Sequence, residues 1–237
     1  MSKTKTLRAP PSNRLLAALP KDEYQRLFPK LEPFPLVFGE VIYEPGDVIR
    51  NVYFPTSGII SLLAAVEDRA TLEVGIVGRE GMVGLPEFMG VKTSGNRAVV
   101  QGAGEAMRMK ATAFRKECEN GGFLPRLLLR YAHSRLTQIG QGAACNRFHP
   151  IDARLARWLL MTRDRMGTDQ FRLTQEFLSN MLGVRREGVN KAAGALQTEK
   201  LVSYSRGHIK VLDRKGLEAV SCVCYGLIKA ESDSYLN

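Results

Sequence analysis

The chain has 237 residues, of which 44% are hydrophobic and 24% charged, a balance that excludes long disordered stretches. Its formal net charge of +10 favours polyanionic partners such as nucleic acid or an acidic membrane surface. No apolar run approaches the ~20 residues that span a bilayer, and the basic N-terminus lacks the pattern of a signal peptide. We therefore expect a cytoplasmic protein with no membrane partner.

A tail and two short helices open the chain. Residues 1–12 contain basic residues and a Pro-Pro pair, which predicts a mobile tail. Asn13 can cap a short helix over residues 14–19, which Pro20 ends. Residues 22–31 predict a second helix, with aromatic and leucine side chains on one side.

A β domain follows the two helices. From residue 35 to about residue 113, short runs rich in Val, Ile, Tyr, Phe and Leu are divided by recurrent glycines. Such frequent turn signals between apolar runs indicate an antiparallel sandwich or barrel. Pro45-Gly46-Asp47 is one such turn, because proline presets φ and glycine accepts positive φ. We assign this domain, together with its N-terminal helices, to residues 13–122.

A long helix is predicted over residues 124–145, within a segment delimited as 123–146. Its apolar residues recur at alternating spacings of three and four, the pattern of a coiled-coil seam, so we expect a homodimer. The seam residues are Leu129, Ala132, Leu136, Ile139 and Ala143. The residues expected to dock on the β domain are Leu124, Leu127, Leu128 and Tyr131. The alternative is one broad apolar face buried inside a monomer.

The motif NRFHP at residues 146–150 predicts a hinge, because proline disfavours helix in the residue before it. A helix is expected over residues 151–166. The residues expected to face inward are Ile151, Leu155, Trp158 and Leu159, with the arginines at positions 154, 157, 163 and 165 on the other sides.

The stretch LTQEFLSNMLGVRREGVNK, residues 173–191, predicts two helices joined by a tight turn. Thr174 can cap a helix over residues 175–182, and Gly183 can take the left-handed conformation that ends it. A second helix is expected from just after Val184 to about residue 199. The alternative to a helix-turn-helix is a helical hairpin whose charged face is merely solvated.

The outer face of the second helix carries side chains that can read base pairs. Arg186 can donate two hydrogen bonds to a guanine, and Lys191 can also donate to guanine. Glu187 can accept from cytosine, and Asn190 lies on the same face. We therefore predict base reading in double-stranded DNA by these four residues.

Residues 201–213 predict a β-hairpin around Arg206-Gly207, which makes the C-terminal domain, residues 147–237, a winged helix-turn-helix. The residues expected to contact DNA phosphates are Thr174, Arg185, Arg206, His208 and Lys210. Readers of this type commonly bind as two-fold dimers.

The order of these parts resembles the Crp/Fnr family of bacterial transcription regulators, over nearly the whole chain from Asn13 to Gly226. Arg186, Glu187 and Lys191 match the base-reading Arg, Glu and Arg of that family, although lysine lacks the bidentate fork of arginine. Arg185 replaces a small capping residue. The resemblance implies an α+β fold with an antiparallel β jelly roll, a long dimerisation helix and a winged helix-turn-helix. It also implies a regulator, not an enzyme, that can contact RNA polymerase.

The effector pocket implied by the resemblance would include Gly84, Leu85, Arg97 and Ala98. In members that bind cyclic AMP, a glutamate holds the ribose and a hydroxyl residue follows the arginine. Here Leu85 and Ala98 stand at those positions, and a ribose hydroxyl buried without a partner costs ~1–3 kcal/mol. We therefore expect no cyclic AMP and no other cofactor, while an unidentified effector stays open.

The cysteines and histidines offer little metal chemistry by their spacing. No cysteine precedes Cys118, which argues against the N-terminal iron–sulfur cluster of some relatives. Cys222 and Cys224 form a CxC that could be a redox or metal pair, but we interpret them as small buried residues and predict no metal site. His149 and His208 are explained as hinge and wing residues, which leaves no clear haem ligand.

Two other functions stay open from sequence. One is a cupin-like metal enzyme on the jelly roll, which needs histidine and carboxylate clusters on strands; no histidine precedes His133. The other is a basic protein that coats nucleic acid without sequence preference, against which the two-domain layout argues.

Overall fold

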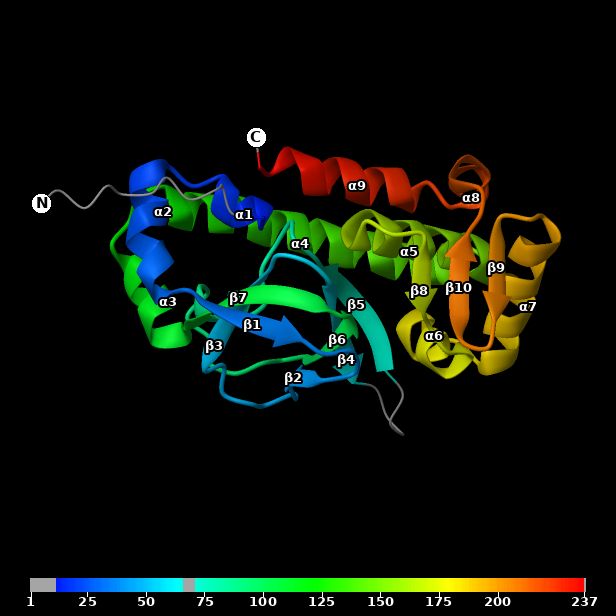
Figure 1. Ribbon diagram of the computed structural model, residues 1–237, viewed down its shortest axis with the longest axis horizontal. Coiled ribbons are helices and arrows are strands. Elements are labelled where there is room, and N and C mark those ends of the chain that lie inside the picture. Colours follow the sequence, from blue (N-terminus) through cyan, green and yellow to red (C-terminus); the bar gives the residue numbers. More distant parts are fainter. Residues whose placement is uncertain (1–11, 66–70, 237) are drawn as a thin grey trace, which may run out of the picture.

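The computed structural model describes residues 12–65 and 71–236, and Figure 1 shows their arrangement. The tail predicted for residues 1–12 lies outside these ranges except for its last residue. Within the described ranges, no helix is long and apolar enough to cross a bilayer.

The N-terminal helices are shorter than predicted. Helix α1 (Arg14–Ala17) has the predicted cap, because the Asn13 side chain accepts a hydrogen bond from the Leu16 backbone nitrogen. Helix α2 (Lys21–Leu27) gives way to a 3-10 turn, η1 (Phe28–Lys30), where one helix over residues 22–31 was expected. Pro29 explains the change, because proline has no N–H to continue an α-helix and its ring clashes with the preceding turn.

Two antiparallel sheets form the β domain. The first has the order β1-β7-β3, and the second has the order β2-β6-β4-β5. The strands of the first sheet are β1 (Glu32–Leu36), β3 (Asn51–Pro55) and β7 (Gly104–Lys110). The strands of the second sheet are β2 (Val41–Tyr43), β4 (Ile59–Ala65), β5 (Thr71–Val77) and β6 (Arg97–Gly102). The inward residues of both sheets, among them Tyr53, Ile60 and Val100, share one core. A short 3-10 turn, η3 (Leu85–Glu87), follows β5.

The long helix α4 (Phe123–Phe148) follows α3 (Ala111–Glu119) and extends beyond the predicted end. The His149 backbone nitrogen still donates to the Cys145 carbonyl, so the segment without helix shrinks to His149-Pro150 and the hinge predicted from residue 146 is too long. The two carboxylate oxygens of Glu23 accept the backbone N–H groups of Phe123 and Leu124, which satisfies the open donors of the first turn.

The inner face of α4 packs on the β domain as predicted. The buried residues on this face are Leu124, Leu127, Leu128 and Tyr131. The Tyr131 hydroxyl accepts from the backbone nitrogen of Met82 at 3.1 Å and donates to its carbonyl at 2.9 Å. Helix and β domain are therefore joined by both apolar packing and paired hydrogen bonds.

The C-terminal domain begins with α5 (Ile151–Met166), as predicted, and then contains the elements of a winged helix-turn-helix. These are β8 (Gln170–Arg172), α6 (Gln175–Leu182), α7 (Arg186–Thr198), β9 (Val202–Ser205) and β10 (His208–Val211). Two last helices, α8 (Arg214–Val220) and α9 (Cys224–Ser234), follow. Figure 1 shows α9 running back along α4, against which it packs.

Helix α5 is buried on more sides than its sequence predicts. Arg154 and Arg157, expected away from the inward face, are 6% and 9% exposed. Arg165 donates to Glu80 at 2.7 Å, and Trp158 Nε1 donates to Glu73 at 2.9 Å. These contacts occur because one side of the helix packs on the winged domain and another packs against the β domain, a tertiary arrangement that helical spacing does not reveal.

Glu73 is the carboxyl group of this domain interface whose pKa is raised. Burial raises its pKa from an ordinary value of 4.5 to about 7, although hydrogen bonds from the Ser61 hydroxyl and Trp158 oppose that rise. Because the folded pKa is raised, the contribution of this group to stability is fully present below its unfolded pKa and is lost as pH rises through about 7.

We predict that Glu73→Gln removes this pH dependence. The neutral amide has no charge to desolvate, so the free energy of unfolding of the variant relative to the wild type should rise by ~1–3 kcal/mol between pH 5 and pH 8. Denaturant unfolding of both proteins at the two pH values measures the difference. Parallel pH profiles would show that Glu73 titrates normally in the folded protein.

Candidate DNA-binding interface

Helices α6 and α7 form the predicted helix-turn-helix around a small apolar core. The Thr174 hydroxyl oxygen accepts from the Phe177 backbone nitrogen at 3.1 Å, which caps α6 as expected. The residues that close the core are Leu178, Met181, Leu182, Val189, Ala192, Ala193 and Leu196. Burying these side chains fixes the angle of α7 and leaves its opposite face in solvent.

The turn requires glycine for two reasons. Gly183 has φ +61° and ψ +43°, the left-handed conformation predicted for it. A Cβ atom added there would also lie 2.7 Å from a methyl group of Leu72 in β5. The turn is therefore both tight and packed against the β domain.

The outer face of α7 presents the four predicted base-reading residues together. Arg186 and Asn190 are four residues apart, as are Glu187 and Lys191, so they form two neighbouring rows on one face. All four are exposed. Gln175 in the first turn of α6 donates to the Asn190 side-chain oxygen at 3.0 Å. The face therefore offers two cations, one carboxylate and one oriented amide to a ligand.

The wing adds a basic edge beside α7. Arg206 and Gly207 connect β9 to β10 with φ values of +48° and +77°, which is the two-residue turn that suits the twist of a hairpin. His208 and Lys210 are exposed, while the alternating Ile209 is buried. The side chains predicted to contact phosphate thus point away from the core.

A third strand, missed by the sequence analysis, completes the wing sheet. Strand β8 pairs antiparallel with β10, and Arg172 lies directly opposite His208. Arg172 is exposed and therefore adds a cation to the same edge. Three residues are too few for a recognisable alternation, so no local signal marked this strand.

Tyr204 fastens the wing to the start of α6. Its hydroxyl donates to the Leu173 carbonyl at 3.0 Å, and the Leu173 nitrogen donates to the Gly207 carbonyl at 2.7 Å. Burial raises the pKa of Tyr204, and the positive charge of Arg186 opposes that rise. Helix α7 also packs against β9, so the recognition helix and the hairpin lie side by side.

The other phosphate candidates also lie at this surface. Arg185 immediately precedes α7 and is exposed, and its side chain makes no capping hydrogen bond. Thr174 is exposed as well, although its hydroxyl oxygen already caps α6. All nine residues predicted to contact bases or phosphates are therefore exposed, and they lie on or next to α7, on the wing or at the start of α6.

The predicted seam lies on the outer face of α4. Leu129, Leu136 and Ile139 are 62%, 65% and 41% exposed in the single chain, and Ala143 is exposed too. Ala132 is the exception at 7% exposed, because it lies nearer the β domain. Four of the five seam residues therefore form an apolar row facing solvent.

A cavity of about 260 Å³ lies between the β domain and α4. Gly84 and Leu85 line it, together with Arg135, Leu136 and Ile139 of α4. The other two residues of the predicted pocket do not line it: Arg97 pairs with Glu44 at 3.4 Å, and Ala98 is fully buried in the core. Of the four residues that the resemblance assigns to the effector pocket, two line this cavity.

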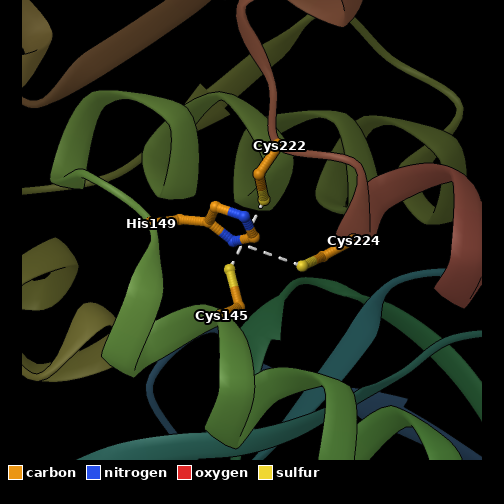
Figure 2. Close-up of side chains that lie close together, drawn as sticks. All are labelled: Cys145, His149, Cys222 and Cys224. Atoms are coloured by element: carbon orange, nitrogen blue, oxygen red, sulfur yellow. Dashed lines mark hydrogen bonds between the residues drawn. The ribbon is translucent and has the colours of Figure 1, made fainter.

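The cysteines are arranged in a way that the sequence did not indicate. Cys222 and Cys224 are buried, and the structure adds Cys145 and His149 beside them, as Figure 2 shows. A hydrogen bond from the Cys222 thiol lowers the pKa of Cys145 below its usual value. These four side chains are the group of potential metal ligands found in the described part of the chain.

Comparison with known proteins agrees with both domains. The family model of the cyclic nucleotide-binding domain matches residues 36–120, and the family model of the Crp-like helix-turn-helix domain matches residues 153–220. A "CRP-like cAMP-activated global transcriptional regulator" of Mycobacterium tuberculosis is 26% identical over 172 residues, which cover 69% of this chain and 76% of that protein.

Two solved structures share the fold. A Crp/Fnr-family transcriptional regulator from Eubacterium rectale has a TM-score of 0.70 at 19% identity, over 87% of this chain and 96% of that one. FixK2 from Bradyrhizobium japonicum has a TM-score of 0.69 at 16% identity, over 81% and 98% of the two chains. With both domain families matched in this order and an exposed recognition helix in the second, the chain belongs to the Crp/Fnr family of transcription regulators, with a DNA-binding helix-turn-helix.

Proposed function

We propose that this regulator binds DNA as a homodimer and reads a near-palindromic site with its two α7 helices in successive major grooves. The observation that carries the proposal is the exposed face of α7, where Arg186, Glu187, Asn190 and Lys191 lie together. In a two-fold dimer, such helices contact half-sites ~34 Å apart. In this proposal the protein binds DNA in the cytoplasm and catalyses no reaction.

The side chains of α7 suit direct reading of base edges. Arg186 can bridge the O6 and N7 atoms of guanine, and Glu187 can accept from the amino group of cytosine. Lys191 adds a single-point donor, because an ammonium group lacks the fork of arginine. A G·C-containing half-site is therefore expected.

The wing and the turn suit the DNA backbone. Arg185, Arg206 and Lys210 are exposed cations at the two sides of α7, and Arg172 extends the wing's edge. Such cations release counterions from DNA, so affinity should fall steeply with salt. Phosphate contacts carry no sequence information, which leaves specificity to α7.

The apolar row on α4 supports the dimer. Burying a leucine or isoleucine side chain contributes ~1.5–3 kcal/mol, and Leu129, Leu136 and Ile139 are at least 41% exposed in the single chain. A second copy of α4 would cover all three by the same contact on both chains. RNA polymerase is a further proposed partner where bound protein activates transcription.

The cavity in the β domain supports an effector other than cyclic AMP. Its lining is mainly apolar, and Leu85 offers no hydrogen-bond acceptor to a ribose hydroxyl. Arg135 is 8% exposed, and among the described residues its Nη2 atom has no hydrogen-bond partner. An apolar ligand with one anionic group fits this lining better than a nucleotide.

The first prediction of this proposed function concerns base reading. Sites are first selected from a random duplex pool with the wild-type protein. Arg186→Ala should then weaken binding to the selected site ~5- to ~150-fold and relax one base position, because a bidentate contact to guanine is lost. Fluorescence anisotropy on the site and its single-base variants measures both effects.

Two matched variants control this experiment. Lys210→Ala should weaken binding to all sequences about equally, since it removes a phosphate contact. Arg126→Ala removes the same charge from an exposed position in the first turns of α4, at the opposite end of that helix from the winged domain, and should change little. An equal loss on every sequence for Arg186→Ala would contradict the base-reading role.

The second prediction concerns the dimer. Leu136→Glu should raise the dimer dissociation constant at least ~100-fold, because it removes an apolar contact from both chains and opposes two carboxylates. Light scattering after size-exclusion chromatography measures the mass. Thr137→Glu places the same charge on the next, exposed residue and should leave the mass unchanged. A wild-type monomer at micromolar concentration would contradict the proposed seam.

The third prediction concerns the ligand. Isothermal titration of the full chain with cyclic AMP should show no binding with a Kd below ~1 mM, because the ribose would face Leu85. The Mycobacterium tuberculosis relative, described as cAMP-activated, provides a positive control. Micromolar binding by this chain would overturn the proposed effector chemistry and leave the DNA-binding proposal intact.

A further inference from the structure

Three cysteines and one histidine meet where the long helix ends. Cys145 lies in the last turn of α4, and His149 is its C-cap. Cys222 lies between α8 and α9, and Cys224 is the first residue of α9. Their potential ligand atoms all lie within 4.8 Å of one another. Figure 2 shows the four side chains pointing toward one centre.

Local geometry explains how each pair is presented. Residues four apart on a helix share a face, so Cys145 and the capping residue His149 point the same way. Cys222 and Cys224 flank Val223, which is 67% exposed while both thiols are buried. The turn into α9 thus directs two sulfur atoms inward and the intervening side chain outward.

The distances suit a tetrahedral metal ion. For Zn–S bonds of ~2.3 Å and a Zn–N bond of ~2.0 Å, ligand atoms are separated by ~3.8 Å between sulfurs and ~3.5 Å between sulfur and nitrogen. The Cys145 and Cys222 sulfurs are 3.4 Å apart, and the Cys224 sulfur is 3.4 Å from His149 Nδ1. The largest separation, 4.8 Å, needs a contraction of only about 1 Å.

The surroundings match the charge of such a site. Three thiolates and a neutral imidazole around Zn²⁺ leave one net negative charge. Arg154 and Arg157 are buried nearby, and their charges act on Cys145. Among the described residues, the Nε atoms of both guanidinium groups have no hydrogen-bond partner. A buried anionic centre would compensate these cations, which are otherwise costly to bury.

A donor to sulfur completes the surroundings. The Gln141 side-chain nitrogen donates to the Cys224 sulfur at 3.0 Å. Such outer hydrogen bonds orient the ligands of metal sites and stabilise thiolate charge. Gln141 lies one turn before Cys145 on α4, so the same helix supplies two ligands and this donor.

We propose that Cys145, His149, Cys222 and Cys224 bind one zinc ion in a closed site. Four protein ligands leave no open position, so the site is structural and not catalytic. It fastens the start of α9 to the end of α4, immediately before the break at His149-Pro150 that leads into the winged domain. The inference does not depend on the proposed DNA recognition, because its tests measure metal and stability.

Metal analysis of the full-length protein tests the proposal. The chain is purified without a histidine tag or chelator under reducing conditions, and zinc is measured by mass spectrometry. We expect about one zinc per chain. Cys222→Ser/Cys224→Ser should lose it, while Cys118→Ser should retain it, because Cys118 in α3 lies outside the cluster. His149→Cys should also retain zinc, since four thiolates form a common zinc site, whereas His149→Ala should lose it.

Cobalt substitution tests the wild-type protein without any variant. Replacing zinc by Co²⁺ should produce the visible bands of a tetrahedral ion and sulfur-to-cobalt charge-transfer absorption. Removing the metal should lower the Tm by at least ~4 °C, because a structural ion contributes to folding free energy. Restoring zinc should restore the Tm.

Three results would overturn the assignment. The first is a wild-type chain that holds no zinc as purified and takes up neither zinc nor cobalt. The second is an oxidised Cys145–Cys222 pair, found by intact mass, in metal-free protein from a reducing purification. The third is iron with acid-labile sulfide in anaerobically purified protein, which would identify an iron–sulfur cluster instead.

Discussion

The division of α4 into two apolar faces is the constraint on which the rest of the structure depends. Its inner face is buried on the β domain through Leu127, Leu128 and the paired hydrogen bonds of Tyr131. Because that face is satisfied within the chain, the outer row that contains Leu136 remains uncovered in a single chain. The β domain, the proposed dimer partner and the DNA-binding domain therefore all take their positions from one helix.

The contacts of α5 connect the two domains. Arg165 pairs with Glu80, and Trp158 donates to Glu73, so the helix that begins the winged domain is held to the β domain by polar groups of low exposure. Burial acts to raise the pKa of Glu80, but Arg165 and backbone donors overcome it and lower that pKa, while the pKa of Glu73 is raised. Because α5 also packs against α7, the β domain and the recognition helix are connected through one helix.

Much of the DNA-binding surface could be predicted because its signals are local. A cap at Thr174, a left-handed glycine at 183 and helical spacing determine a helix-turn-helix within a few residues, and the exposed face of α7 follows from the same periodicity. Local signals failed where three-residue elements or packing decided the outcome. Strand β8 was too short to recognise, and Arg154 and Arg157 are buried only because elements distant in sequence enclose α5.

The sequence by itself determined the order of the domains, the two faces of α4 and the residues that α7 presents, because hydrophobic periodicity and capping act between near neighbours. Only the tertiary structure decided that Cys145 and His149 meet Cys222 and Cys224, across some seventy residues of intervening chain. It also decided that the cavity takes in Leu85 and excludes Arg97. The physical reason is the same for both: the return of α9 along α4 and the pairing of strands bring together side chains whose spacing in the chain carries no information about their distance.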